Sequence, residues 1–159
     1  RGLAKVRACM IWLILATLVV VFVVGFRILT SSSRRAIRRL SERLGITPEP
    51  VESMVDQLGK AQGEEYLHYL ERPNEAHLQN AAQMLLIWQV CIVDGSESNM
   101  LSWHRRLQKA RLAAPITDAQ VRLALSFLRE LEPEISELNA FQYRYNALFH
   151  DENGVHWLH

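Results

Sequence analysis

Cysteine is scarce in this sequence of 159 residues, which contains only Cys9 and Cys91. Neither cysteine belongs to a CxxC pair of the kind found in redox and zinc sites. Cys9 lies in a long apolar run and Cys91 in an apolar helix, so we do not expect the two to pair. We interpret both as small buried hydrophobic residues, which is consistent with a reducing compartment.

Motifs of the common enzyme classes are also missing. The sequence contains no G-x-S-x-G, no P-loop, no GxGxxG and no H-E-x-x-H. The acid-rich run Glu130–Glu137 is interpreted as a solvated helix face. A possible metal site near the C-terminus consists of residues in a polar turn and at the chain end: His150, Asp151, Glu152, His156 and His159. Metal ligands need converging geometry, so we interpret this group as a solvated tail. We expect no catalytic residue, cofactor or metal, and an enzyme acting on lipid headgroups is the least favoured function.

Acidic residues are absent from the first part of the chain, where the first is Glu42. Residues 1–41 hold eight Lys or Arg, whereas residues 42–159 hold ten Lys or Arg and all seventeen acids. The net charge of +1 therefore hides a basic N-terminal part and an acidic remainder. A nucleic-acid-binding protein would carry its basic residues on the folded domain, so we expect no nucleic-acid partner.

The longest apolar run extends from Ala8 to Phe26 without a charged residue. As a helix it would extend about 28 Å, close to the thickness of a bilayer's hydrocarbon core. The sequence therefore predicts a single N-terminal transmembrane helix over residues 8–29. A cleaved signal peptide is the main alternative, although the sequence after Phe26 is a poor cleavage site.

The basic residues around this run predict its orientation. Six arginines follow it: Arg27, Arg34, Arg35, Arg38, Arg39 and Arg43. Basic residues close to a span are retained on the cytoplasmic side, so we predict a single-pass membrane protein with a cytoplasmic C-terminal domain. This prediction of orientation is weakened by three basic residues before the apolar run, Arg1, Lys5 and Arg7. A translation start at Met10 would remove all three.

The same six arginines are the candidate site for contact with a lipid bilayer. Residues 30–45 are predicted to form a basic juxtamembrane helix with Ile37, Leu40 and Leu44 on one face. Each arginine near anionic headgroups would contribute about 1 kcal/mol of binding free energy. The alternative is that the arginines are a topology signal alone.

A second basic group lies beside Trp103 and consists of His104, Arg105, Arg106, Lys109 and Arg111. Such a group can form salt bridges within the domain, contact lipid headgroups or bind an acidic partner. Salt bridges within the domain are the commonest outcome.

The rest of the chain has the pattern of an all-α fold. Apolar residues recur at helical spacing, and no stretch shows the sustained period-two alternation of a strand. Gly45 is expected to end one helix, and Thr117 with Gln120 to cap another. We predict that residues 46–150 form a compact bundle of five or six helices and residues 151–159 a C-terminal tail. The predicted core is centred on Leu85, Leu86, Trp88, Ile92, Trp103, Leu107, Leu125, Leu128, Leu138 and Tyr145.

Five segments carry a resemblance to a known family. They are GFRILTSSSRRAIRRLSERL, VESMVDQLGKAQGEEYLHYLERP, LQNAAQMLLIWQVCIVDGSE, WHRRLQKARLAAPITDAQVRLAL and the ending NGVHWLH. On these segments the chain resembles the YicN family of small bacterial inner-membrane proteins, from about Met10 to His159. The resemblance implies a bacterial single-pass protein that starts at Met10, so Arg1–Cys9 departs from the family pattern. The family has no assigned activity, cofactor or catalytic residue, and the resemblance implies none here.

These observations favour a membrane-anchored interaction or scaffolding module. Its partner would be an unidentified membrane or cytoplasmic protein, or a second copy of the chain. The alternative is a small regulatory subunit that packs through the helix face of Ala16, Thr17 and Gly25 on a larger membrane transporter or protease.

Overall fold

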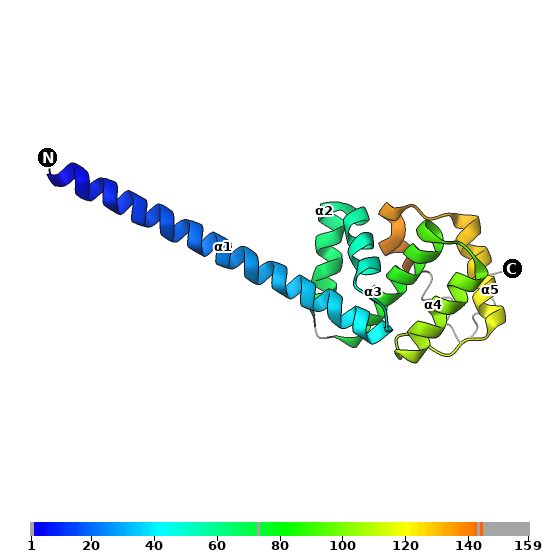
Figure 1. Cartoon of the computed structure of the whole chain (residues 1–159). Coiled ribbons are helices and arrows are strands. Elements are labelled where there is room, and N and C mark those ends of the chain that lie inside the picture. The colour runs from blue at the N-terminus through cyan, green and yellow to red at the C-terminus, as the bar shows by residue number, and fades with distance from the viewer. Residues whose placement is uncertain (1, 73, 143, 145–159) are drawn as a thin grey trace. The chain divides into compact units, whose positions relative to one another are not determined.

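The computed structural model describes residues 2–72, 74–142 and 144; for residues 2–11, 13 and 26–31 it describes the backbone alone. The described residues form five α-helices, one π-helical segment and one 3-10 turn, and all of their regular secondary structure is helical (Figure 1). The predicted all-α class is confirmed. The chain divides into two compact units, Arg1–Arg35 and Ala36–His159, called unit 1 and unit 2 below.

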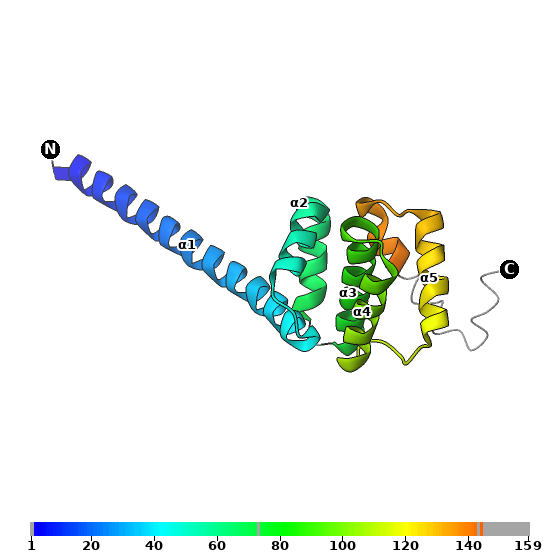
Figure 2. The same ribbon diagram turned by 45° about the vertical axis from the view of Figure 1, so that its right-hand side comes forward.

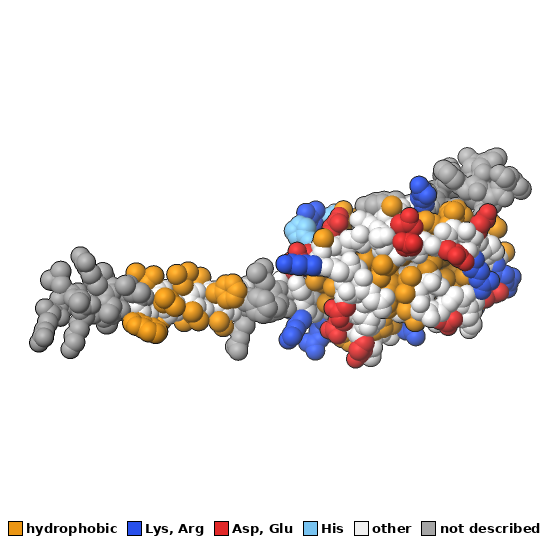
Figure 3. Space-filling view, turned by 90° about the horizontal axis from the view of Figure 1, so that it is seen from above, with side chains coloured by type: hydrophobic (Ala, Val, Ile, Leu, Met, Phe, Trp, Pro, Cys, Tyr) orange, Lys and Arg blue, Asp and Glu red, His pale blue; other side chains and the backbone are white. Residues whose placement is uncertain are grey.

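Unit 1 consists of the first part of helix α1, which runs over Gly2–Leu44. Its described apolar side chains are exposed, as the orange atoms of Figure 3 show. Trp12 is 74% exposed and Phe22 is 73% exposed. The described part of unit 1 therefore carries apolar side chains on its surface.

The structure does not support the predicted membrane span. Within the described part of the chain, no helical stretch combines the length and the apolarity that crossing a bilayer requires. The finding contradicts the predicted transmembrane helix over residues 8–29 and the predicted single-pass inner-membrane location.

The last turns of α1 belong to the core of unit 2. Ala36, Ile37, Leu40 and Leu44 are buried, with Leu40 at 0% exposure. Unit 2 therefore includes part of segment 30–45, which the sequence predicts to be a separate basic juxtamembrane helix. The apolar face of that segment packs on unit 2 because burying it stabilises the fold.

Gly45 ends α1 as the sequence predicts. Its φ of +65° lies in the left-handed region, where glycine has no side chain to strain. The N–H of Ile46 then donates to the carbonyl of Ser41 at 3.0 Å, which satisfies one of the free carbonyl groups at the helix end.

Helix α2, over Glu49–Glu71, is bent by glycine. Gly59 has φ 76° and ψ 178°, which interrupts the helical path and redirects the chain. Gly63 follows one turn later, where a Cβ atom would lie 2.9 Å from the carbonyl oxygen of Val55. Glycine at position 63 therefore allows the two halves of α2 to pass close to each other.

Helix α3, over Glu75–Trp88, forms the centre of the core. Asn74 caps its start, because the side-chain oxygen accepts a hydrogen bond from the N–H of Ala76 at 2.9 Å. Leu85, Leu86 and Ile87 are each 0% exposed. The helix is thus buried nearly all round, as its apolar sequence predicts.

A π-helical segment, η1, continues α3 over Gln89–Val93 and overturns one predicted core residue. The N–H of Asp94 donates to the carbonyl of Gln89 at 2.8 Å, an i to i+5 bond that inserts an extra residue into the turn. Val90 is 3% exposed, whereas Ile92 is 42% exposed. The prediction that Ile92 lies in the core is therefore wrong, because it assumed that the apolar run Met84–Val93 is buried on every side, whereas its end is exposed.

Three further elements belong to unit 2: α4 over Glu97–Lys109, α5 over Asp118–Leu131 and the 3-10 turn η2 over Ile135–Glu137. Helix α3 packs between α2 and α4, and α5 packs on α4 (Figure 2). The predicted capping box of Thr117 and Gln120 is present at the start of α5. Eight of the ten predicted core residues are buried, Ile92 is not, and Tyr145 lies outside the described residues.

Candidate functional site

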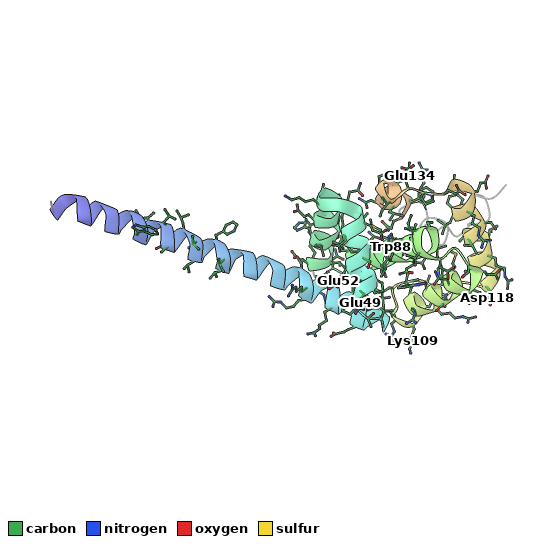
Figure 4. All side chains as sticks on the ribbon, turned by 45° about the horizontal axis from the view of Figure 1, so that its top comes forward. Glu49, Glu52, Trp88, Lys109, Asp118 and Glu134 are labelled. Carbon is green, nitrogen blue, oxygen red and sulfur yellow. The ribbon has the colours of Figure 1, made fainter. Side chains whose placement is uncertain are left out.

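Unit 2 has a groove of about 950 Å³ between the end of α1 and the exposed face of α4. Its basic residues are Arg43, Arg105, Arg106 and Lys109, and its acids are Glu42 and Glu97. The half-buried Leu101 contributes apolar surface, whereas the lining residues Leu44 and Ala110 are buried. We call this hollow the basic groove. Lys109 is labelled at its edge in Figure 4, on the opposite side of unit 2 from Glu134.

The amphipathic pattern of α4 places the cations in the groove. Met100, Trp103, His104 and Leu107 are buried on one face of the helix, so Arg105, Arg106 and Lys109 fall on the outward face. Arg105, Arg106 and Lys109 are all exposed. The charged surface of the groove thus follows directly from the helical spacing of the sequence.

Two groove arginines are held by backbone carbonyls. Arg43 donates from Nε to the carbonyl of Ala110 at 2.9 Å and from Nη2 to Glu75 Oε1 at 2.5 Å. Arg106 donates from Nη1 to the carbonyl of Gly45 at 3.2 Å. A carbonyl acceptor positions a guanidinium without neutralising it, so Arg106 keeps its full positive charge.

The other two groove cations are more open. Arg105 lies 3.7 Å from Asp118, with both side chains more than half exposed. An ion pair of this kind is worth about 1 kcal/mol or less. Lys109 forms no hydrogen bond or ion pair that is seen among the described residues. Arg122 Nε forms an ion pair with Glu97 Oε1 at 2.5 Å, and this contact raises the pKa of Arg122.

His104 is not part of the basic surface, although the sequence groups it with its neighbours. Its side chain packs into the core beside Trp103, and the residue is 3% exposed. Burial lowers the pKa of His104 from 6.5 to about 4, so the ring is neutral at pH 7. The sequence spacing could have predicted the burial of His104, since positions 100, 103, 104 and 107 form one helix face.

The six arginines of the predicted lipid-binding site have different environments. The Arg27 side chain lies outside the described residues, and Arg34 and Arg35 are exposed in unit 1. In unit 2, Arg38 lies 3.7 Å from Glu42, and Arg39 donates to the carbonyl of Leu70 at 2.6 Å. Arg39 and Arg43 therefore join α1 to the rest of unit 2. Contact of the group with anionic headgroups stays a prediction.

An acidic segment occupies the end of α5 and the residues after it, Glu130–Glu134, and we call it the acidic turn. Its three glutamates are exposed, and Leu131 is 44% exposed. Glu132 has the left-handed φ of 40°, which is unfavourable for a residue with a side chain. The turn borders a second hollow of about 440 Å³ beside η1.

The described residues offer no group of three or more His, Cys, Asp or Glu side chains able to hold a metal ion. The possible metal site near the C-terminus, from His150 to His159, lies outside the described residues. Burial raises the pKa of the Cys91 thiol to about 11, so this thiol stays protonated at neutral pH.

Comparison with known proteins gives relatives of unknown function. The family described as "Protein of unknown function (DUF1198)" matches residues 10–152. The chain is 73% identical over 150 residues to "Uncharacterized protein YicN" of Escherichia coli strain K12, a match that covers 94% of this chain and 100% of that protein. The same figures hold for the YicN protein of Escherichia coli O157:H7.

A solved structure has a similar fold. It is the crystal structure of a protein of unknown function from Yersinia pestis, which matches with a TM-score of 0.52 and 27% sequence identity. The match covers 82% of this chain and 98% of that chain. The helical arrangement is therefore shared with a protein at low sequence identity.

Proposed function

We propose that unit 2 is a protein-interaction module whose basic groove binds an acidic segment of a protein partner. The chain belongs to the DUF1198 family of proteins of unknown function. The observation that carries the proposal is the convergence of four cations on one groove.

The dimensions of the groove support a peptide rather than a single small ion. Its volume of about 950 Å³ is at the upper end of the range for ligand sites in proteins. The half-buried Leu101 supplies apolar surface among the charges. A segment with both acidic and apolar side chains would match both components of this surface.

The electrostatics of the groove also support an acidic partner. Arg106 is held in place by a neutral carbonyl, so its position is fixed and its charge is not compensated there. The exposed pair of Arg105 with Asp118 is weak enough for another carboxylate to replace it. The groove thus presents positive charge at little cost in side-chain reorganisation.

The alternative, a regulatory subunit that packs through a membrane-spanning helix, requires a span that is not found in the described part of the chain.

A fluorescence-anisotropy titration tests the proposal. The full chain is added to a labelled peptide of alternating Glu and Leu, with the Gln counterpart as the control peptide. Lys109→Glu should weaken binding about tenfold, since it replaces an attraction by a repulsion in the groove. Lys60→Glu is the matched control, because Lys60 is an exposed lysine of α2 outside the groove.

Binding should also weaken as salt increases, because exposed charges are screened. An equal loss of binding in Lys60→Glu and Lys109→Glu would contradict the proposal, since it would indicate attraction to the whole molecule. Tighter binding of a single-stranded oligonucleotide than of the peptide would assign the groove to nucleic acid instead.

A further inference from the structure

We infer that the partner segment of the basic groove is the acidic turn of a second copy of this chain, so that copies associate head to tail. The inference rests on the proposed function, because it names the occupant of the same groove. It follows from the charge, the shape and the placement of the two surfaces.

The charges of the two surfaces are complementary. The acidic turn carries Glu130, Glu132 and Glu134, all exposed, and the groove carries four cations. Neither Glu130 nor Glu132 has a side-chain partner that is seen among the described residues. The neighbouring Arg129 is engaged by the carbonyl of Gly95 at 2.7 Å and does not neutralise them through a short ion pair.

The apolar surfaces match as well. Leu131 is 44% exposed and lies between two of the glutamates. The groove offers the half-buried side chain of Leu101 beside its cations. A leucine flanked by carboxylates can therefore cover apolar surface while its neighbours pair with basic side chains.

The backbone of the acidic turn is fixed before binding. The N–H of Glu132 closes α5 by donating to the carbonyl of Leu128 at 2.9 Å, and Pro133 is buried. Glu132 has φ 40° and ψ 60°, a conformation in which glycine is the usual residue at a helix end. A glutamate at this strained position gives the turn a carboxylate that glycine would not supply. A fixed turn loses little conformational entropy on binding.

Lys109 of the groove and Glu134 of the turn cannot meet within one molecule. Figure 4 shows these two residues on opposite sides of unit 2. A contact between them must therefore join two copies, and the resulting pair keeps one free groove and one free turn. Such a heterologous contact extends into longer assemblies unless a rotation closes it into a ring.

Zero-length cross-linking tests the inference. A carbodiimide joins a lysine amine to a carboxylate only when the two are in contact. Equal amounts of full chain with natural and 15N isotopes are mixed, treated and digested, and cross-linked peptides are read by mass spectrometry. About half of the peptides that link Lys109 to Glu130, Glu132 or Glu134 should contain one chain of each isotope, as random pairing between copies requires. Their yield should fall about tenfold at about 0.5 M salt, where screening is nearly complete.

Two variants sharpen the experiment. Lys109→Glu and the triple Glu130→Gln, Glu132→Gln, Glu134→Gln variant should each associate poorly alone. A mixture of the two should associate as pairs, because the acidic turn of the first fits the unaltered groove of the second. This recovery is specific to a head-to-tail contact.

The possible outcomes separate the inference from the proposed function. Binding of the acidic peptide without mixed-isotope links from Lys109 would overturn the inference and leave the proposed function intact. Loss of both would refute both. Equal yields of mixed-isotope links from Lys60 and Lys109 to the acidic turn would indicate random encounters and would also overturn the inference.

Discussion

The burial of His104 predicts a specific loss of stability in acid. The residue is 3% exposed, and its pKa falls from 6.5 to about 4 because burial disfavours the charged ring. The folded state therefore takes up the proton less readily than the unfolded state. Above about pH 6.5 both states are neutral at this site and stability is unaffected. Between pH 6.5 and pH 4 the unfolded state gains protons, so the free energy of unfolding falls as pH falls.

The magnitude follows from the two pKa values. A difference of this size corresponds to about 3 kcal/mol when the full window is crossed, and to about 2 kcal/mol at pH 5. Domains of this kind have total stabilities of about 5–15 kcal/mol, so the loss is large enough to measure.

Urea unfolding followed by tryptophan fluorescence measures the effect, because Trp88 and Trp103 lie in the core of unit 2. His104→Gln removes the titrating group, so the stability difference between the unaltered chain and this variant should shrink by about 2 kcal/mol from pH 7 to pH 5. The control is His68→Gln, since His68 is exposed and contacts Arg72 at 2.9 Å. If His104→Gln and the unaltered chain lose stability in parallel as the pH falls, the reasoning from burial is refuted.

Three further predictions concern the stability of unit 2 and can be checked by the same unfolding assay. Leu40→Ala should lower the free energy of unfolding by about 2–5 kcal/mol, because Leu40 is fully buried; a loss below about 1 kcal/mol would show that the end of α1 is not part of the core. Val90→Asp should unfold the domain, whereas Ile92→Asp should be tolerated because this side chain is 42% exposed; the reverse order would contradict the π-helical register. Thr117→Ala should cost about 1 kcal/mol through loss of the helix cap, and Thr117→Ser should restore most of it.

Local chemistry made part of the fold predictable. Gly45 ends α1, Asn74 caps α3, and Thr117 with Gln120 caps α5, because each feature depends on residues within a few positions of one another. The central position of the second half of α3 was also predictable, since Met84–Trp88 are all apolar.

Features that depend on distant contacts were not predictable in the same way. The Arg39 and Arg43 side chains donate to carbonyls 31 and 67 residues away, which the charge pattern alone does not reveal. The outward turn of Ile92 depends on one inserted residue in η1 that periodicity does not register. The basic groove was half predictable: the sequence identifies the cations of α4, but their pairing with the end of α1 needs the fold.

The contacts of the α1 end also set an order for folding during synthesis. Arg43 cannot donate to the carbonyl of Ala110 until 67 further residues have been added to the chain. At about 5–20 residues per second, ribosomes take roughly 3–13 seconds to add them. Throughout that interval Leu40 and Leu44 have no completed core to enter, because α4 does not yet exist. The first-made part of unit 2 is therefore among the last to be completed, and the nascent chain exposes this apolar face to chaperones for seconds in every round of translation.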